Sequence, residues 1–95
     1  MADGTIVRWR VLFSGSVQHV GFRYTAYYLA RGLSLTGWVN NRYDGSVEME
    51  VQGEVARIRK MLLQLKSKPQ LRILSMEIEE IPPVPRERRF EVRGV

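Results

Sequence analysis

Apolar and polar residues alternate along three stretches of this chain, and each alternation predicts a β-strand with one buried face. The apolar positions of these stretches are Val7, Trp9, Val11 and Phe13, then Val47, Met49 and Val51, and then Leu74, Met76 and Ile78. The first of these strands is expected to end at Ser14–Gly15. A run rich in Thr, Trp and Val predicts a further strand from Leu35 to Asn41, and a short final strand contains Phe90 and Val92.

Two other stretches carry apolar residues at helical spacing. The first stripe is Phe22, Ala26, Leu29 and Leu33, and the second is Val55, Ile58, Met61, Leu62 and Leu65. Gly32 suits the end of the first helix, and the turn at Tyr43–Gly45 joins two strands as a hairpin, with Gly45 free to take a positive φ. The resulting order is βαββαβ with a short extra C-terminal strand. This order is typical of an α+β, ferredoxin-like sandwich, in which two helices cover one face of an antiparallel sheet.

The length of 95 residues fits one domain, which we expect at residues 6–95 after a flexible tail at residues 1–5. The other face of the sheet is expected to be solvated and charged, with ion pairs between neighbouring strands. Its predicted members are Arg8, Arg10, Glu48, Glu50, Glu77, Glu79, Glu91 and Arg93. We expect Phe22 and Trp38 in the core.

The composition of the chain argues against several kinds of catalytic and metal site. The chain has no cysteine and one histidine, so neither a thiolate nucleophile nor a metal site of cysteines or histidines is expected. No signal peptide or membrane span is visible, and the prediction is a cytoplasmic monomer without a metal or cofactor. The net charge of +5 favours anionic ligands, which include nucleic acids and small phosphorylated molecules.

One loop between the first strand and the first helix contains the candidate chemistry. Two glycines, Gly15 and Gly21, permit a tight curl in which successive backbone N–H groups form an anion-binding nest. The helix that follows adds its positive end, and Arg23 in its first turn can hold phosphate oxygens through two N–H groups. The alternative is an ordinary glycine-rich turn beside an arginine. The loop is neither a Walker loop nor a dinucleotide-binding fingerprint.

Two motifs resemble the signatures of the acylphosphatase family. The first is Ser14-Gly-Ser-Val-Gln-x-Val-Gly-Phe-Arg23, and the second is Leu35-Thr-Gly-Trp-Val-x-Asn41 followed by Asp44-Gly-Ser-Val-Glu48. A closing Gln52-Gly-Glu54 also matches, and the resemblance extends over nearly the whole chain from the first strand onward. It implies the ferredoxin-like fold and a cofactor-free hydrolase of acyl phosphates.

The resemblance also implies roles for individual residues. Arg23 becomes the catalytic arginine that binds phosphate, and Asn41 becomes the residue that orients the attacking water. The expected phosphate-binding residues are Gly15, Ser16, Val17, Gln18, His19, Val20 and Arg23. His19 departs from the family pattern, because glycine is usual at its position, and Arg42 and Tyr43 replace smaller residues. A catalytic role for His19 is less favoured than a substitution that faces solvent.

Two alternatives to the hydrolase remain at this point. One is a non-catalytic ferredoxin-like binding module, although the third strand lacks the aromatic run of RNA-binding sheets and carries Glu48 and Glu50. The other is an accessory domain of the same family acting in carbamoyl transfer. Asn41 alone could equally be a turn residue at the start of the hairpin loop.

Overall fold

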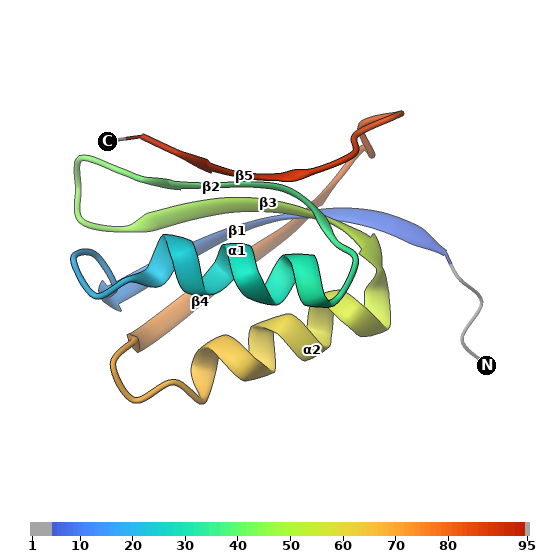
Figure 1. Ribbon diagram of the computed structural model, residues 1–95. Coiled ribbons are helices and arrows are strands. Elements are labelled where there is room, and N and C mark those ends of the chain that lie inside the picture. The colour runs from blue at the N-terminus through green and yellow to red at the C-terminus, as the bar shows by residue number, and fades with distance from the viewer. Residues whose placement is uncertain (1–4, 95) are drawn as a thin grey trace.

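The computed structural model describes residues 5–94, and the order of its elements is the predicted one (Figure 1). The elements are β1 (Ile6–Ser16), α1 (Phe22–Gly32), β2 (Thr36–Asn41), β3 (Val47–Glu54), α2 (Val55–Lys66), β4 (Arg72–Ile81) and β5 (Phe90–Arg93). The strands form one sheet in the order β4-β1-β3-β2-β5. Both helices lie on one face of it, as the ferredoxin-like prediction requires. The predicted tail lies outside the described residues except for Thr5, which is exposed.

The sheet is mixed, so the expectation of an antiparallel sheet is wrong at one edge. β2 pairs with β5 in parallel, whereas the pairs β1–β3, β1–β4 and β2–β3 are antiparallel. β4 ends at the end of the sheet where β2 begins (Figure 1). The chain then crosses to the opposite edge of the sheet and reverses its direction. β5 therefore runs in the same direction as β2.

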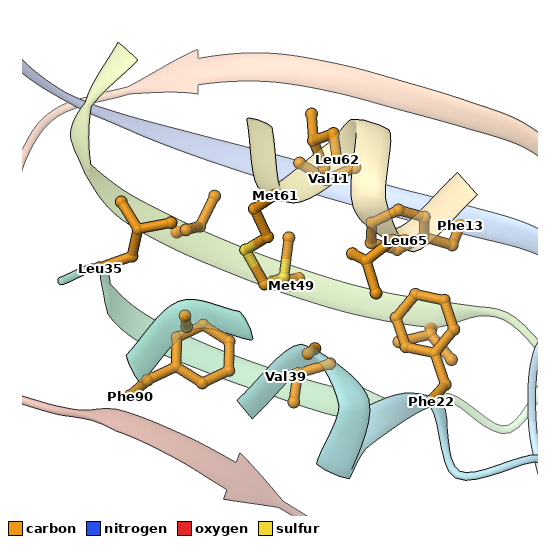
Figure 2. Packing of buried hydrophobic residues seen from close by; sticks show 14 of the residues in the cluster. Val11, Phe13, Phe22, Leu35, Val39, Met49, Met61, Leu62, Leu65 and Phe90 are labelled. Atoms are coloured by element: carbon orange, nitrogen blue, oxygen red, sulfur yellow. The ribbon is translucent and has the colours of Figure 1, made fainter. Parts of the chain in front are cut away.

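The core lies between the two helices and the sheet, and Figure 2 shows its apolar side chains meeting there. Phe13 of β1 packs against Phe22 of α1 with ring centroids 4.8 Å apart, which confirms Phe22 as a core residue. Trp38 is not in the core, contrary to the prediction. It alternates with the buried Val39, so it lies on the face away from the helices, which we call the open face. The guanidinium of Arg93 covers its ring at 4.7 Å.

The edge strand β4 is less buried than its alternation predicted. The pairing with β1 shifts register between Ser14 and Gly15, because β4 contains an extra residue at Leu74. This bulge leaves Leu74 83% exposed, and Ile78, which lies beside α2, is still 47% exposed. Bulges of this kind are common at sheet edges, where they disturb the ladder that another chain could extend.

The open face carries the predicted ion pairs between strands. Arg10 of β1 contacts Glu48 of β3 at 2.7 Å, and Arg8 contacts Glu50 at 2.8 Å. Arg8 is not solvated, however, since only 2% of it is exposed. The segment 82–89 between β4 and β5 covers it, and Glu87 of this segment contacts Arg8 at 2.8 Å. We call this segment the crossing segment.

Several boundaries differ from the predicted ones. β1 continues through Gly15 to Ser16, and Gly53 lies inside β3 rather than between elements. Gly32 is the last residue of α1, but the left-handed residue that follows the helix is Ser34, at φ 56°. Leu35 N–H donates to Ala30 O at 2.9 Å, which closes a Schellman motif around Ser34.

Candidate active site

The loop 17–21 joins β1 to α1 at the end of the sheet where the β2–β3 turn and the C-terminus also lie (Figure 1). Val17 is fully buried and anchors the loop in the core. His19 has φ 63° and Gly21 has φ 79°, whereas Gln18 and Val20 have no positive φ. Alternation of left-handed and ordinary conformations turns successive N–H groups toward one side, which is the geometry of an anion-binding nest.

The N–H groups of this loop are available for a ligand. Within residues 5–94, the N–H groups of residues 18–21 donate to no backbone carbonyl. The first hydrogen bond of α1 is Thr25 N–H to Gly21 O, so the preceding N–H groups of the helix have no intrahelical acceptor. The first turn of α1 contains no acidic residue. The positive end of the helix is therefore not neutralised by its own carboxylates and favours an anion.

Gln18 fixes the loop to the β2–β3 turn, a role that the sequence analysis missed. Its side-chain Nε2 donates to Arg42 O at 2.7 Å and to Ser46 O at 2.8 Å. The turn is itself ordered by Asp44, whose Oδ1 accepts from Ser46 N–H at 3.0 Å. Donation from the Ser46 hydroxyl and N–H lowers the pKa of Asp44. The loop and the turn thus form one connected unit through two backbone carbonyls.

Arg23 lies in the first turn of α1, and its guanidinium is held by the C-terminal strand. Its Nη1 donates to Arg93 O at 2.7 Å. Gly94 packs close behind, because a Cβ at this position would lie 3.4 Å from Nη1 of Arg23 and 2.7 Å from Oδ1 of Asn40. The C-terminal residues therefore orient Arg23, a contact between residues 70 positions apart that no local motif could reveal.

Asn41 is the last residue of β2, and its side chain carries an unusual feature. Among the described residues, its Oδ1 is the one buried side-chain polar atom without a hydrogen-bond partner. An unpaired buried acceptor costs free energy unless a ligand or water satisfies it. This oxygen therefore does not accept the backbone hydrogen bond that a simple turn asparagine makes.

Arg23 and Asn41 line the same cavity, whose volume is about 210 Å³. The structure also brings Val17, His19 and Gly21 to this cavity, together with Phe22 and Tyr24, which the sequence analysis did not include in the site. Four other predicted site residues do not line it, namely Gly15, Ser16, Gln18 and Val20. Gly15 and Ser16 belong to β1 and pair with β4. Gly15 is required there by the sheet, since a Cβ would lie 2.1 Å from Arg72 O.

The titratable residues of the described chain form no metal-binding group. Within residues 5–94, no group of three or more His, Asp or Glu residues is placed so that it could hold a metal ion. Neither of the two helices in that range combines the length and apolar character of a membrane-spanning helix.

The comparisons with known proteins agree with the fold and with the sequence motifs. The sequence model of the acylphosphatase family matches residues 9–92. An acylphosphatase from Polaromonas naphthalenivorans is 38% identical over 94% of this chain and 90% of its own length. The crystal structure of an acylphosphatase from Bacillus subtilis superposes with a TM-score of 0.86 at 29% identity, covering 93% of this chain and 99% of that one.

A longer protein contains the same fold. The crystal structure of full-length HypF matches 96% of this chain with a TM-score of 0.85 and 28% identity, but the match covers 12% of that chain. The family model and the Polaromonas relative span nearly the whole of the described domain. The chain belongs to the acylphosphatase family.

Proposed function

We propose that this protein hydrolyses the carboxyl–phosphate bond of acyl phosphates, which yields a carboxylate and inorganic phosphate. Membership of the acylphosphatase family supports this reaction. The observation that carries the proposal is the cavity of about 210 Å³ that Arg23 and Asn41 line together.

In the proposed complex the phosphoryl group lies at the start of α1. The N–H groups of the loop 17–21 and the guanidinium of Arg23 donate to its oxygens and stabilise the charge that the transition state spreads over them. Of the other residues predicted to bind phosphate, Gln18 acts by holding the loop against the β2–β3 turn. Gly15 and Ser16 act by fixing the end of β1.

Asn41 positions the nucleophile. Its carboxamide group holds a water molecule by a hydrogen bond, and this water attacks phosphorus in line with the departing carboxylate oxygen. The phosphorus–oxygen bond to the acyl group breaks, the electron pair leaves with the carboxylate, and a phosphate oxygen takes the proton of the water. The carboxylate is a stable leaving group with an ordinary pKa near 4, so its departure needs no acid. Positioning and charge stabilisation therefore account for the reaction without a metal.

Hydrolysis of benzoyl phosphate tests the proposal. The wild-type protein is expected to hydrolyse it equally well with and without EDTA. Arg23→Ala and Asn41→Ala are each expected to lower kcat/KM by at least about 100-fold, because each removes a group aimed at the transition state. Arg59→Ala and Gln70→Ala are matched controls, since both residues are exposed and outside the cavity.

Circular dichroism and thermal unfolding establish that all four variants are folded. Loss of activity in EDTA would contradict a metal-free reaction. Undiminished hydrolysis by both Arg23→Ala and Asn41→Ala would contradict the residue roles, and an inactive wild-type protein would contradict the function.

The match to full-length HypF supports one alternative, namely that the chain serves as an accessory domain for another catalytic unit. The benzoyl phosphate assay separates the two functions, because an accessory domain that needs its partner is inactive by itself. The assay also addresses the non-catalytic binding module, which would show no turnover.

We further propose that the protein acts as a cytoplasmic monomer on a small-molecule acyl phosphate and does not bind nucleic acid. The ion pairs of the open face support the last point, since Glu48 and Glu50 occupy the guanidinium groups of Arg10 and Arg8 that could otherwise contact a phosphate backbone. The absence of cysteine from the sequence supports a fold that is independent of an oxidising compartment. Gel filtration with light scattering, and titration with a single-stranded oligonucleotide, test the assembly state and the partner.

A further inference from the structure

A second cavity lies at the opposite end of α1 from the candidate active site. Its volume is about 580 Å³, more than twice the 210 Å³ of the active-site cavity, and the two cavities share no lining residue. It is formed where α1 ends, β2 begins and the crossing segment enters β5. Figure 1 shows these three points at one end of the molecule, with the loop 17–21 and the C-terminus at the other.

Three arginines form the rim of this cavity. Arg31 comes from the last turn of α1, and Arg88 and Arg89 come from the crossing segment. Arg31 stacks on the ring of Tyr27 at 5.7 Å and donates to its hydroxyl at 3.3 Å. No aspartate or glutamate lines the cavity, and within residues 5–94 neither Arg88 nor Arg89 makes an ion pair.

The carboxylates next to Arg88 and Arg89 in the sequence form ion pairs with other arginines. Glu87 precedes the pair and contacts Arg8 at 2.8 Å, beneath the crossing segment. Glu91 follows the pair and contacts Arg93 at 3.4 Å. The positive charge of the rim is therefore not compensated locally, and it attracts an anion of more than one charge.

The floor of the cavity is apolar. Leu35 and Phe90 form it and are 3% and 4% exposed, and the half-buried ring of Tyr27 lies beside them. The hydroxyls of Ser34 and Thr36 supply further polar groups. The lining therefore combines a small apolar floor with several polar and charged groups, and the volume is within the range of roughly 300–1,000 Å³ that is usual for small-molecule sites.

The position of the arginine pair is fixed by the fold. Arg89 O accepts from Gly37 N–H at 3.1 Å, which joins the segment to the start of β2. Gln52 holds the earlier part of the segment, because its side chain exchanges two hydrogen bonds with the backbone of Val84 at 2.8 and 3.0 Å. A backbone held in this way lowers the entropic cost of presenting two guanidinium groups to one ligand.

We propose that this cavity binds a small organic polyphosphate. Its apolar ring packs on Leu35 and Phe90, and its phosphate groups accept hydrogen bonds from Arg31, Arg88 and Arg89. The guanidinium group suits this chemistry because it donates two parallel N–H groups to phosphate oxygens. The site does not depend on the proposed hydrolysis, which uses a different cavity.

Titration of the ¹⁵N-labelled full chain with ADP and with pyrophosphate tests the site. ADP is expected to cause saturable shifts of the amides of residues 34–37 and 88–90, and pyrophosphate is expected to bind more weakly because it lacks the ring. The double variant Arg88→Gln/Arg89→Gln is expected to raise the Kd for ADP at these amides by at least about tenfold.

The matched control is Arg59→Gln/Lys60→Gln, which removes two positive charges from exposed positions of α2. It is expected to change the Kd less than twofold. Equal weakening by both double variants would show attraction by net charge alone and overturn the proposal. Shifts confined to residues 17–24 and 41, binding of pyrophosphate as tight as that of ADP, or the absence of saturable shifts would also overturn it.

Discussion

His19 is the residue at which this chain departs most from the family pattern within the loop. The resemblance implies glycine at its position, and the structure shows the reason, since the residue has φ 63°. Histidine accepts this region better than most side chains, although it does so at some cost. Its side chain is exposed at the cavity, so the loop closes without burying it.

Replacement of His19 by glycine tests what this side chain contributes. The left-handed strain disappears, while the unfolded chain gains entropy, so the free energy of unfolding is expected to change by less than about 1 kcal/mol. Hydrolysis of benzoyl phosphate is expected to stay within threefold of the wild type. A 100-fold loss in a folded variant would instead assign His19 a catalytic role.

Arg23 and Asn41 show how far single residues could be predicted. The motifs marked both residues, and the structure brings both to one cavity. The contacts that orient Arg23 were not predictable, because Arg93 O belongs to a distant strand and a carbonyl has no sequence signature. Gln18 was expected only as a backbone donor, and its side-chain contacts appear only once the β2–β3 turn is in place.

At the scale of elements, Gly15 and Gly37 have a different structural role from Gly32. Gly15 and Gly37 lie inside strands with positive φ, and a Cβ at either position would overlap the backbone of a neighbouring strand. Gly32 ends α1 with open space around it and without a positive φ. The sequence analysis placed Gly15 in the phosphate-binding loop. In the structure, a Cβ at this position would instead overlap Arg72 O of β4.

This difference predicts opposite effects of alanine at Gly15 and Gly32. Gly15→Ala forces β1 away from β4 and is expected to cost about 3 kcal/mol or more, because the clash and the strain at φ 128° add. Gly32→Ala meets no atom and is expected to stabilise the protein by about 0.5–1 kcal/mol. Urea unfolding of both variants measures the two values. A Gly15→Ala protein as stable as the wild type would contradict the spacing argument.

At the scale of the whole molecule, the crossing segment joins the two edges of the sheet. It buries Arg8 against Glu50 and Glu87, so part of the open face becomes an interior. Burial disfavours the charged guanidinium, but the hydrogen bonds that it donates to Glu87 and Glu50 outweigh this effect and raise the pKa of Arg8 above its ordinary value. The same segment carries Arg88 and Arg89 to the second cavity.

Arg8 and Arg10 provide a matched pair of arginines on one strand. Arg8→Met leaves two carboxylates near a covered site without their partner and is expected to cost about 3–5 kcal/mol. Arg10→Met is expected to cost at most about 1 kcal/mol, because Arg10 is 33% exposed and water screens its pair with Glu48. The midpoints of urea unfolding give both values. Equal costs for the two variants would contradict the role of the crossing segment.

The sequence by itself determined the order and type of the elements, the helix-covered face of the sheet, and the residues of the two motifs. These features are local, because apolar periodicity reports which face of an element is buried and short motifs lie on one turn or loop. The tertiary structure alone decided the parallel pairing of β5, the burial of Arg8, the exposure of Leu74 and the open-face position of Trp38. Each of these depends on the path of the crossing segment or on which strand lies at an edge of the sheet. Contacts between residues far apart in the chain produce no periodic pattern in the sequence.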